Sequence, residues 1–495
     1  MTGACSTENP FFGVRETAET SEATSASGST SPADTTGAPP TPTTGADTSG
    51  GPSSSGEGST AADSSSSGGA LSSSTTGETA ASSTSTSTSS GEMDGSGGSS
   101  TGLEAVCGDG VQDEGELCDD GNDAPADACE WNCRPMFELK TATIAAHPRQ
   151  IAAGDLDGDQ NIDLVISHAN EGEEGPDLSF GRSLGDGEFA WTTLDDKTMN
   201  GAGLLLLGRF AGDAKLDVIA IPADGASTPR LWINVSMAAK ISFTVALPVP
   251  GPPAISYAAA VAGDLNKDSK DDLLFLQKGA QKLYVQRNTG GAFAAANVYT
   301  MQLPQPVGLA VGPLLDGDDV ADVLLVHADP VTDLTFMKGN GDPNGTLKPL
   351  ADALKLCPAG AASISAGDAD GGGTLDAAIA CHDAKAIVIG QDGENDYMLP
   401  MGGALPQLLG AGIIDLYGDD EQADMFAVAA GSSSLYIGVF SGAKFLAPDE
   451  VQLAWALGAS LAADVTADGA PDIVVLHPGD ARVSVLINQT RMALP

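Results

Sequence analysis

Seven short apolar runs, each opening on an aspartate, recur along the chain at intervals of 48 to 55 residues. Each run holds a few apolar residues between Gly- and Asp-rich segments, which indicates a buried strand rather than a helix. A second apolar run follows in most repeats, such as KLYVQR from Lys282 and VSVLIN from Val483. The opening residues of the seven runs are Asp163, Asp217, Asp272, Asp322, Asp376, Asp424 and Asp472.

Each repeat therefore predicts about four strands: one before an acidic turn, one after it, the second run and an outer strand. Seven such units of about 50 residues predict an all-β fold, a seven-bladed β-propeller of four-stranded blades. The last repeat ends soon after VSVLINQTRMALP without an outer strand, so we expect residues 137–144 to supply it. We expect the outer strands of three other repeats to open at Phe189, Phe293 and Phe445.

The charge balance limits the partners. The chain has 22 Lys+Arg against 67 Asp+Glu, a formal net charge of -45, whereas nucleic acids and anionic lipids are bound by basic surfaces. We therefore expect no nucleic-acid partner and favour divalent cations. The apolar run at 204–207 is far shorter than the ~20 residues of a membrane span.

Composition divides the chain into four regions. Residues 1–19 form an N-terminal region, and residues 20–104 are mostly Ser, Thr, Gly, Ala and Pro. The second region cannot bury enough apolar surface to order itself, so it predicts a disordered linker, either a plain tether or a glycosylated stalk. Residues 105–134 hold four cysteines, and residues 135–495 hold the repeats.

The four clustered cysteines, Cys107, Cys118, Cys129 and Cys133, contain no CxxC pair, which favours two disulfides over a zinc site. Their pattern, CGDG…CDDGN…C…C, resembles the short cysteine-rich repeat common in myxobacterial surface proteins. That resemblance implies export and an oxidising compartment.

The remaining cysteines leave two questions open. Cys357 and Cys381 either pair or stay as buried thiols. The start MTGACSTENPFF resembles the end of a lipoprotein signal, in which small residues precede a lipidated cysteine, although no charged or apolar signal region precedes Cys5. Either the true start lies upstream and Cys5 carries a lipid anchor, or Cys5 is incidental.

The acidic turn of the first repeat, GDLDGDQNIDLVI, places four aspartates close together. At about 4 Å and an effective dielectric near 20, each like-charge pair costs up to about 4 kcal/mol. A hard cation with oxygen ligands would offset that repulsion. An EF-hand is excluded because position 12, counted from Asp155, is Ile166 within a strand instead of a bidentate Glu.

The repeats over 136–495 resemble the FG-GAP/VCBS family, which also forms the head of integrin α chains. The resemblance implies Ca²⁺ bound by loop positions 1, 3, 5 and 9, with a backbone carbonyl at position 7. The implied ligands are Asp155, Asp157, Asp159, Asn161 and Asp163 in blade one; Asp264, Asn266, Asp268, Lys270 and Asp272 in blade three; Asp368, Asp370, Thr374 and Asp376 in blade five; and Asp464, Thr466, Asp468, Ala470 and Asp472 in blade seven.

Several loops depart from this pattern. Gly372 replaces the third carboxylate in blade five, and a hydroxyl replaces one carboxylate in blade seven. Blade two has Arg209 and Ala211 at positions 1 and 3, so we expect it to bind no metal. Blades four and six have Leu314 and Leu416 at position 1, with Asp415 one residue out of register. Calcium loops should thus alternate with degraded ones, and their role should be structural.

The five histidines offer a second kind of site. His168, His327 and His477 each follow the last loop aspartate by five residues, with His382 close to that position and His147 in a nearby loop. They are either repeated strand-end residues or a His-lined ligand or metal site on the face opposite the calcium loops.

No nucleophile elbow, P-loop, HExxH or dinucleotide motif is present. The sequence therefore predicts a non-catalytic, monomeric calcium-binding protein, secreted or held at the cell surface, that acts in adhesion or binds a protein or polysaccharide. The alternatives are a carbohydrate-active enzyme, a structural subunit of a surface complex and a metal-scavenging protein. The predicted ligand loops are His168–Asp177, Pro222–Pro229, His327–Asp333 and His477–Asp480.

Overall fold

The computed structural model describes residues 136–145, 147–169, 175–196, 199, 201–222, 228–244, 246–249, 256–301, 305–314, 319–328, 334–367, 375–383, 385–389, 396–399, 407–417, 424–441, 444–445 and 448–490. The predictions on the lipid anchor at Cys5, the linker and the four-cysteine module lie outside these residues. Within them no helix is long and apolar enough to cross a membrane.

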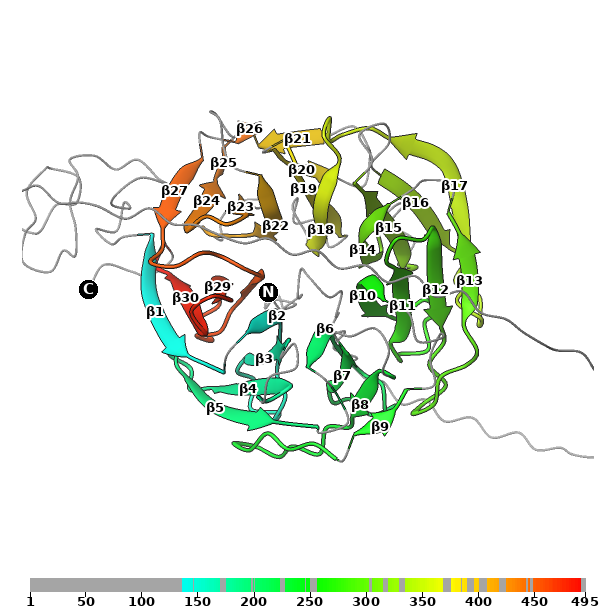
Figure 1. Ribbon diagram of the computed structural model, residues 1–495, viewed down its shortest axis with the longest axis horizontal. Helices are drawn as coiled ribbons and strands as arrows, with labels where there is room; N and C mark the ends of the chain where they lie inside the picture. Colours follow the sequence, from blue (N-terminus) through cyan, green and yellow to red (C-terminus); the bar gives the residue numbers. More distant parts are fainter. Residues whose placement is uncertain are drawn as a thin grey trace, which may run out of the picture. The chain divides into compact units, whose positions relative to one another are not determined.

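Seven four-stranded antiparallel sheets stand around a ring, as Figure 1 shows, which confirms the predicted seven-bladed β-propeller. Blades one and two comprise β2 (Pro148–Gly154), β3 (Asp163–His168), β4 (Leu178–Ser183), β5 (Phe189–Leu194), then β6 (Ala202–Gly208), β7 (Asp217–Pro222), β8 (Arg230–Trp232), β9 (Leu247–Pro248). Blades three and four comprise β10 (Tyr257–Gly263), β11 (Asp272–Gln277), β12 (Lys282–Gln286), β13 (Asn297–Thr300), then β14 (Pro306–Gly312), β15 (Asp322–His327), β16 (Leu334–Gly339), β17 (Leu347–Leu354).

The other blades follow the same order. Blade five comprises β18 (Ala361–Gly367), β19 (Asp376–Cys381), β20 (Ala386–Ile389) and β21 (Asp396–Leu399). Blade six comprises β22 (Leu408–Ile414), β23 (Asp424–Ala429), β24 (Ser434–Gly438) and β27 (Asp449–Gln452), and it carries the hairpin β25 (Phe440–Ser441) and β26 (Lys444–Phe445). Blade seven comprises β28 (Ser460–Ala463), β29 (Asp472–His477), β30 (Arg482–Asn488) and β1 (Phe137–Thr143).

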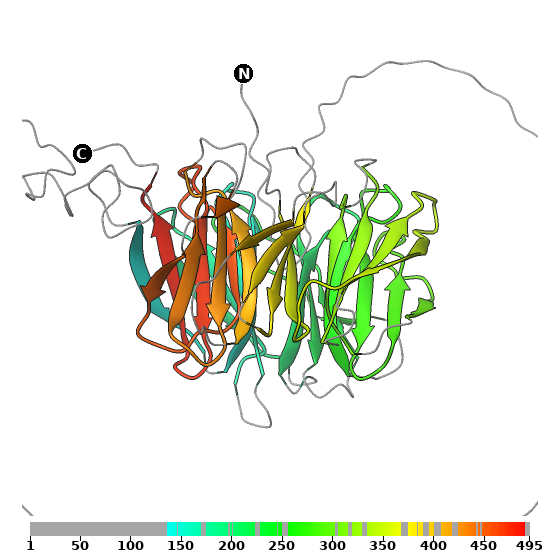
Figure 2. The same ribbon diagram turned by 90° about the horizontal axis from the view of Figure 1, so that it is seen from above.

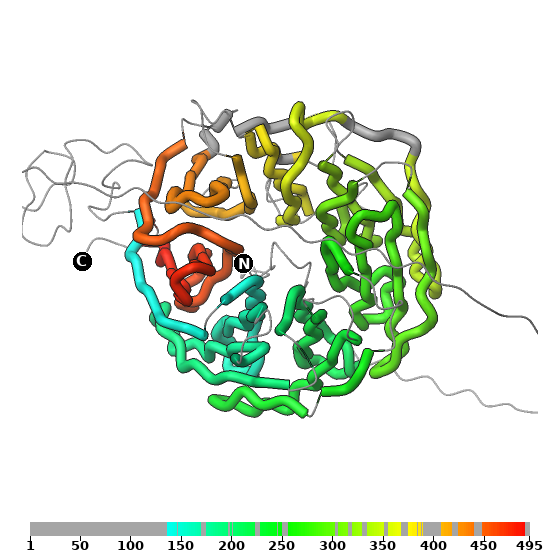
Figure 3. The backbone as a smooth tube through the Cα atoms, in the orientation of Figure 1, coloured from blue at the N-terminus to red at the C-terminus, as the bar shows by residue number. Residues whose placement is uncertain are grey.

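The ring closes by joining the two ends of the propeller. β1 pairs with β30 along its whole length, from Phe137 opposite Asn488 to Thr143 opposite Arg482. The cyan tube of β1 and the red tube of β30 therefore lie side by side in Figure 3. This confirms that the segment predicted at 137–144 is the missing outer strand of the last blade.

The predicted starts of the outer strands are right in one blade of three. β5 does begin at Phe189. Phe293 instead closes a tight turn by bridging Asn288, and the outer strand β13 starts four residues later. Phe445 belongs to the β25–β26 hairpin, and β27 starts at Asp449. Short hairpins inserted before these strands move the aromatic residue off them.

The second strand of each blade is buried along most or all of its length, as in β3 and β29. A strand covered on both faces has no solvent side, so its sequence is a continuous apolar run instead of an alternating one. The apolar clusters lie between neighbouring blades, and the first includes Leu156, Leu206, Phe210 and Phe275. In side view the blades pack face to face with their strands along the ring axis (Figure 2).

Cys357 and Cys381 form a disulfide. The bond ties the segment between β17 and β18 to the end of β19, so it fixes the connection between blades four and five. Of the two alternatives that the sequence left open, the pair is correct and the free thiols are wrong.

Candidate functional site

The acidic loop of blade one, residues 155–163, connects β2 to β3. Its first aspartate organises the turn: Asp155 accepts the backbone N–H of Gly158 at 2.7 Å and that of Gln160 at 3.0 Å. Both donors have positive φ, 79° and 73°. The loop therefore wraps around Asp155 and turns the next two carboxylates inward.

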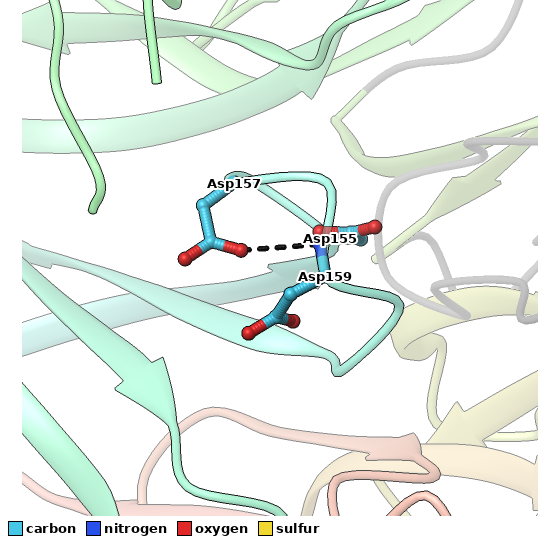
Figure 4. Close-up of side chains that lie close together, drawn as sticks. All are labelled: Asp155, Asp157 and Asp159. Carbon is cyan, nitrogen blue, oxygen red and sulfur yellow. Dashed lines mark hydrogen bonds between the residues drawn. The ribbon is translucent and has the colours of Figure 1, made fainter. Parts of the chain in front are cut away.

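Asp155, Asp157 and Asp159 offer carboxylate oxygens that all lie within 4.8 Å of one another. Figure 4 shows the three side chains on this turn, with Asp157 Oδ1 accepting the Asp159 N–H at 3.2 Å. Asp157 is only 5% exposed, and its Oδ2 is buried without a hydrogen-bond partner. Burial, and then the charges of Asp159 and Asp155, raise the pKa of Asp157. A cation placed among these oxygens would satisfy the orphaned oxygen and offset the repulsion, so the residues fit a hard ion.

Within the described part of the chain, Arg182 is the cation that pairs with this cluster. Arg182 on β4 places Nη1 3.6 Å from Asp159 Oδ2, and both side chains are partly exposed. A partly exposed pair contributes at most about 1 kcal/mol, so it cannot balance three carboxylates.

The last aspartate of the loop has a role that sequence reasoning missed. Asp163 is fully buried; its Oδ2 accepts the Leu156 N–H at 2.9 Å and its Oδ1 accepts the Ser183 N–H at 2.8 Å. It thus ties the loop to the end of the third strand. Burial raises its pKa to about 6. We call this pair of contacts the aspartate staple.

The same aspartate also holds the loops of other blades, including blade two, whose loop has no carboxylate at positions 1 and 3. In blade two Asp217 accepts Phe210 N at 3.0 Å, Ala211 N at 2.6 Å and Asn234 N at 2.7 Å. Equivalent bonds join Asp322 to Gly339, Asp424 to Leu416, and Asp472 to Val465 and Asn488. The sequence carried the signal, because this aspartate persists in blade two where positions 1 and 3 are Arg and Ala.

The staple continues into the neighbouring blade. Asn234 of blade two donates its side-chain N–H to the Leu156 carbonyl of blade one at 2.8 Å. Asn288 bonds the Phe210 carbonyl and Asn488 the Leu416 carbonyl in the same way, and Ser183 Oγ donates to the Val465 carbonyl. In each case a side chain of the next blade therefore bonds a backbone carbonyl of the acidic loop. An ion that makes one loop more rigid should consequently make the contact between those two blades more rigid as well.

Blades three and seven repeat the loop conformation of blade one. In both, position 1 accepts the N–H of position 6: Asp264 from Ser269 at 2.7 Å and Asp464 from Gly469 at 2.9 Å. Positions 4 and 6 again have positive φ, at Lys267, Ser269, Ala467 and Gly469.

The two loops are less well prepared for an ion than blade one. In blade three the ammonium of Lys270 lies 3.4 Å from Asp268 Oδ2, where it competes with a cation. In blade seven position 3 is Thr466, a neutral hydroxyl whose Oγ1 bonds Asp472 at 3.3 Å, so this loop offers one carboxylate fewer than that of blade one. Among the described residues, a group of three acidic ligands occurs at the blade-one loop.

Of the loops in blades two, four, five and six, the structure describes that of blade two in full. In blade two the position-1 residue Arg209 donates its backbone N–H to the buried Asp271 at 2.7 Å, and Lys215 bonds the Ser236 carbonyl through Nζ. Arginine offers no carboxylate to a cation, in keeping with a metal-free loop. The predicted ligands Asp368, Asp370 and Thr374 of blade five lie outside the described residues, as do 315–318 and 418–423.

Three histidines are interior residues. His168, His327 and His477 are buried, and each places Nε2 at 2.8 or 2.9 Å from a hydroxyl on the adjacent strand, that of Ser179, Thr335 or Ser484. Burial lowers the pKa of His477. The repeated strand-end interpretation is therefore correct for these three, and a ligand site lined by them is wrong.

No protein-family model and no curated protein matches the sequence. Solved structures with similar folds include BBS1N in complex with ARL6DN, with a TM-score of 0.47, 11% identity, and coverage of 73% of this chain and all of that one. Others are a rhamnogalacturonan lyase of Bacillus licheniformis, with a TM-score of 0.37, 13% identity, and coverage of 74% of this chain and 66% of that one, and a Photorhabdus luminescens Tc holotoxin pore, with a TM-score of 0.36, 14% identity, and coverage of 68% and 16%. Such identities carry no information on function.

Proposed function

We propose that this chain is a non-catalytic, calcium-stabilised β-propeller that recognises a protein or polysaccharide ligand at the cell surface. The observation that carries the calcium assignment is the Asp157 side chain, buried with one oxygen unpartnered beside two further carboxylates. Oxygen-only ligands in a flexible loop suit Ca²⁺ better than Zn²⁺, which is bound mainly by Cys and His.

In blade one the ion would be held by Asp155, Asp157, Asp159 and the Asn161 carbonyl, with Asp163 closing the loop onto β4. In blade three it would be held by the corresponding residues from Asp264 to Asp272. The ion supplies positive charge alone. With a Kd of about 0.1 mM and about 2 mM Ca²⁺, one site stabilises the folded state by about 1.8 kcal/mol. Because side chains of the next blade bond the carbonyls of these loops, an ordered loop would also stabilise the contact between the two blades.

The binding role is supported by how the two faces differ. On one face the acidic loops are held by aspartate side chains and by side-chain bonds from the next blade. On the other face the repeated bonds are backbone bonds within a blade, such as Ala169 N–H to the His147 carbonyl and Ala328 N–H to the Gln305 carbonyl. Loops held on a rigid scaffold commonly carry recognition. The net charge of -45 and the Cys357–Cys381 bond suit an oxidising, extracellular setting, and anchoring through Cys5 is part of the proposal.

The test is a ligand screen on the full chain, with glycan arrays and surface-protein pull-downs in 2 mM Ca²⁺ and in EDTA. The proposal expects a saturable ligand whose capture weakens in EDTA. Turnover of a polysaccharide by the purified protein, abolished by a point substitution, would instead establish an enzyme.

A further inference from the structure

A pocket of about 540 Å³ opens on the face opposite the acidic loops, where blades six, seven and one meet. It is bounded by the starts of three inner strands and by the segments beside them. The lining residues are His147, Pro148, Arg149, Gln150, Ala169, Leu409, Gly410, Val428, Leu457, Gly458, Ala459, Ser460 and Pro478. Its volume lies in the range of about 300–1,000 Å³ that is typical of small-molecule sites.

Two small residues contribute to the open space of the pocket. Gln150 opposes Ser167 on the adjacent strand, and its side chain accepts the Leu205 N–H of blade two at 2.8 Å. Gly410 occupies the same register position in blade six, opposite Val428, and Ala459 does so in blade seven, where its carbonyl accepts the Leu476 N–H. Neither has a side chain that could reach the next blade as that of Gln150 does.

The inner strand of blade seven is also the shortest. β28 has four residues, whereas the inner strands of the other six blades have seven each. The residues before it, Leu457 to Ala459, line the pocket as an irregular segment.

The lining combines an apolar wall with a few polar groups. Leu409 is 43% exposed, which is unusual for a large aliphatic side chain, whereas Val428 and Leu457, which also border the pocket, are 1% and 4% exposed. Ser460 is 1% exposed, and its hydroxyl is buried without a hydrogen-bond partner. A buried hydroxyl without a partner is uncommon in folded proteins, and rotation about χ1 can present it to a ligand.

The charge of the lining is opposite to that of the chain. Although the chain has 67 Asp+Glu against 22 Lys+Arg, none of the lining residues is acidic, and Arg149 contributes an exposed guanidinium. A guanidinium pairs with a carboxylate through two parallel hydrogen bonds. No Phe, Tyr or Trp lines the pocket, so the large flat rings on which sugars commonly stack are missing from it.

We propose that this pocket binds a small aliphatic carboxylate, either a free acid or the last residue of a polypeptide. Arg149 pairs with the carboxylate, Ser460 donates to it, and the aliphatic part packs on Leu409. The inference deepens the proposed recognition role, on which it rests, by naming the ligand chemistry of this face.

Calorimetric titration of the full chain with hexanoate, N-acetyl-Ala-Leu and the amide of that dipeptide tests the inference. Both acids, or one of them, should bind, and the amide should not. Tighter binding of the dipeptide acid assigns a polypeptide terminus, and tighter binding of hexanoate assigns a free acid. Equal binding of the dipeptide acid and its amide, or no heat from any probe, overturns the inference.

The variant Arg149→Gln should weaken binding of the acids about tenfold, the size expected for losing a hydrogen-bonded charge. Lys278→Gln removes an equally exposed cation near the end of β11, outside the pocket, and should leave affinity within about twofold because screening weakens distant surface charges. Ala459→Leu should abolish binding by filling the space. If Arg149→Gln binds like the parent, the assignment of the carboxylate partner is wrong, whereas calcium binding and ligand capture in the screens test the proposed function separately.

Discussion

Replacing Asp157 by Asn should stabilise the protein in the absence of calcium and abolish the further stabilisation that calcium gives the parent. The asparagine oxygen can keep the bond to the Asp159 N–H, and its amide takes the place of the oxygen that has no partner. The substitution therefore removes a buried charge and leaves the turn intact.

The magnitudes follow from the spacing of the three carboxylates. At up to 4.8 Å, each like-charge pair costs about 1 kcal/mol at the dielectric constant of water and about 3 kcal/mol at an effective value near 20. Asp157 takes part in two of the three pairs, so in EDTA Asp157→Asn should be more stable than the parent by about 2–6 kcal/mol. In 2 mM Ca²⁺ the parent gains the binding energy of this loop, about 1.8 kcal/mol, and the variant does not, so the advantage of the variant should shrink by that amount.

Differential scanning calorimetry in both buffers measures the effect, and a domain of this size shifts its Tm by about 1–2 °C per kcal/mol. Asp213→Asn is the matched control: it removes one exposed charge from the loop of blade two, where Arg209 stands at position 1, and should respond equally in both buffers. A parent that is more stable than Asp157→Asn in EDTA would show that the cluster is not electrostatically strained, and the calcium argument would fail at its first step.

Three further predictions concern the ring. Deleting residues 137–143 should lower the Tm by many degrees, because β30 loses the partner that it pairs with along seven residues; an unchanged melt would refute the closure. Replacing Cys357 and Cys381 by Ala should cost about 3 kcal/mol for a loop of 24 residues, as seen by urea unfolding; an unchanged midpoint contradicts this. In EDTA the Tm should fall as pH rises from about 4 through about 6, because burial raises the pKa of Asp217 to about 6 and the folded state then loses a tightly held proton. His477 acts in the opposite sense: burial lowers its pKa, so it destabilises the fold as pH falls through about 6.5. The aspartates whose pKa burial raises outnumber this one histidine, so their effect should dominate. A Tm that is highest above pH 7 contradicts this balance.

The repeat spacing was sufficient to predict the blades. Aspartates 48 to 55 residues apart, each followed by an apolar run, mark the second strand of every sheet, and the missing outer strand after VSVLIN indicated closure by 137–144. Strand starts at Phe293 and Phe445 were wrong because an inserted hairpin leaves no apolar signature of its own.

Prediction of the site was less complete, for a physical reason. Loop spacing identifies carboxylates but does not show which of their oxygens bind the protein itself. Asp163 and Asp472 direct both oxygens to backbone N–H groups, which a ligand pattern cannot show. Asn234 and Asn488 follow the last loop aspartate by 17 and 16 residues, so their recurrence was visible in the sequence, but their bonds to the preceding blade were not.

Isothermal titration of Ca²⁺ into the chelator-treated full chain tests the central claim, that the acidic turns are corners of the ring clamped by an ion. The account predicts saturable binding in at least the loop of blade one, lost in Asp157→Asn and kept in Asp213→Asn, with a matching rise in Tm. No heat of binding, together with a Tm unchanged by EDTA, would contradict it.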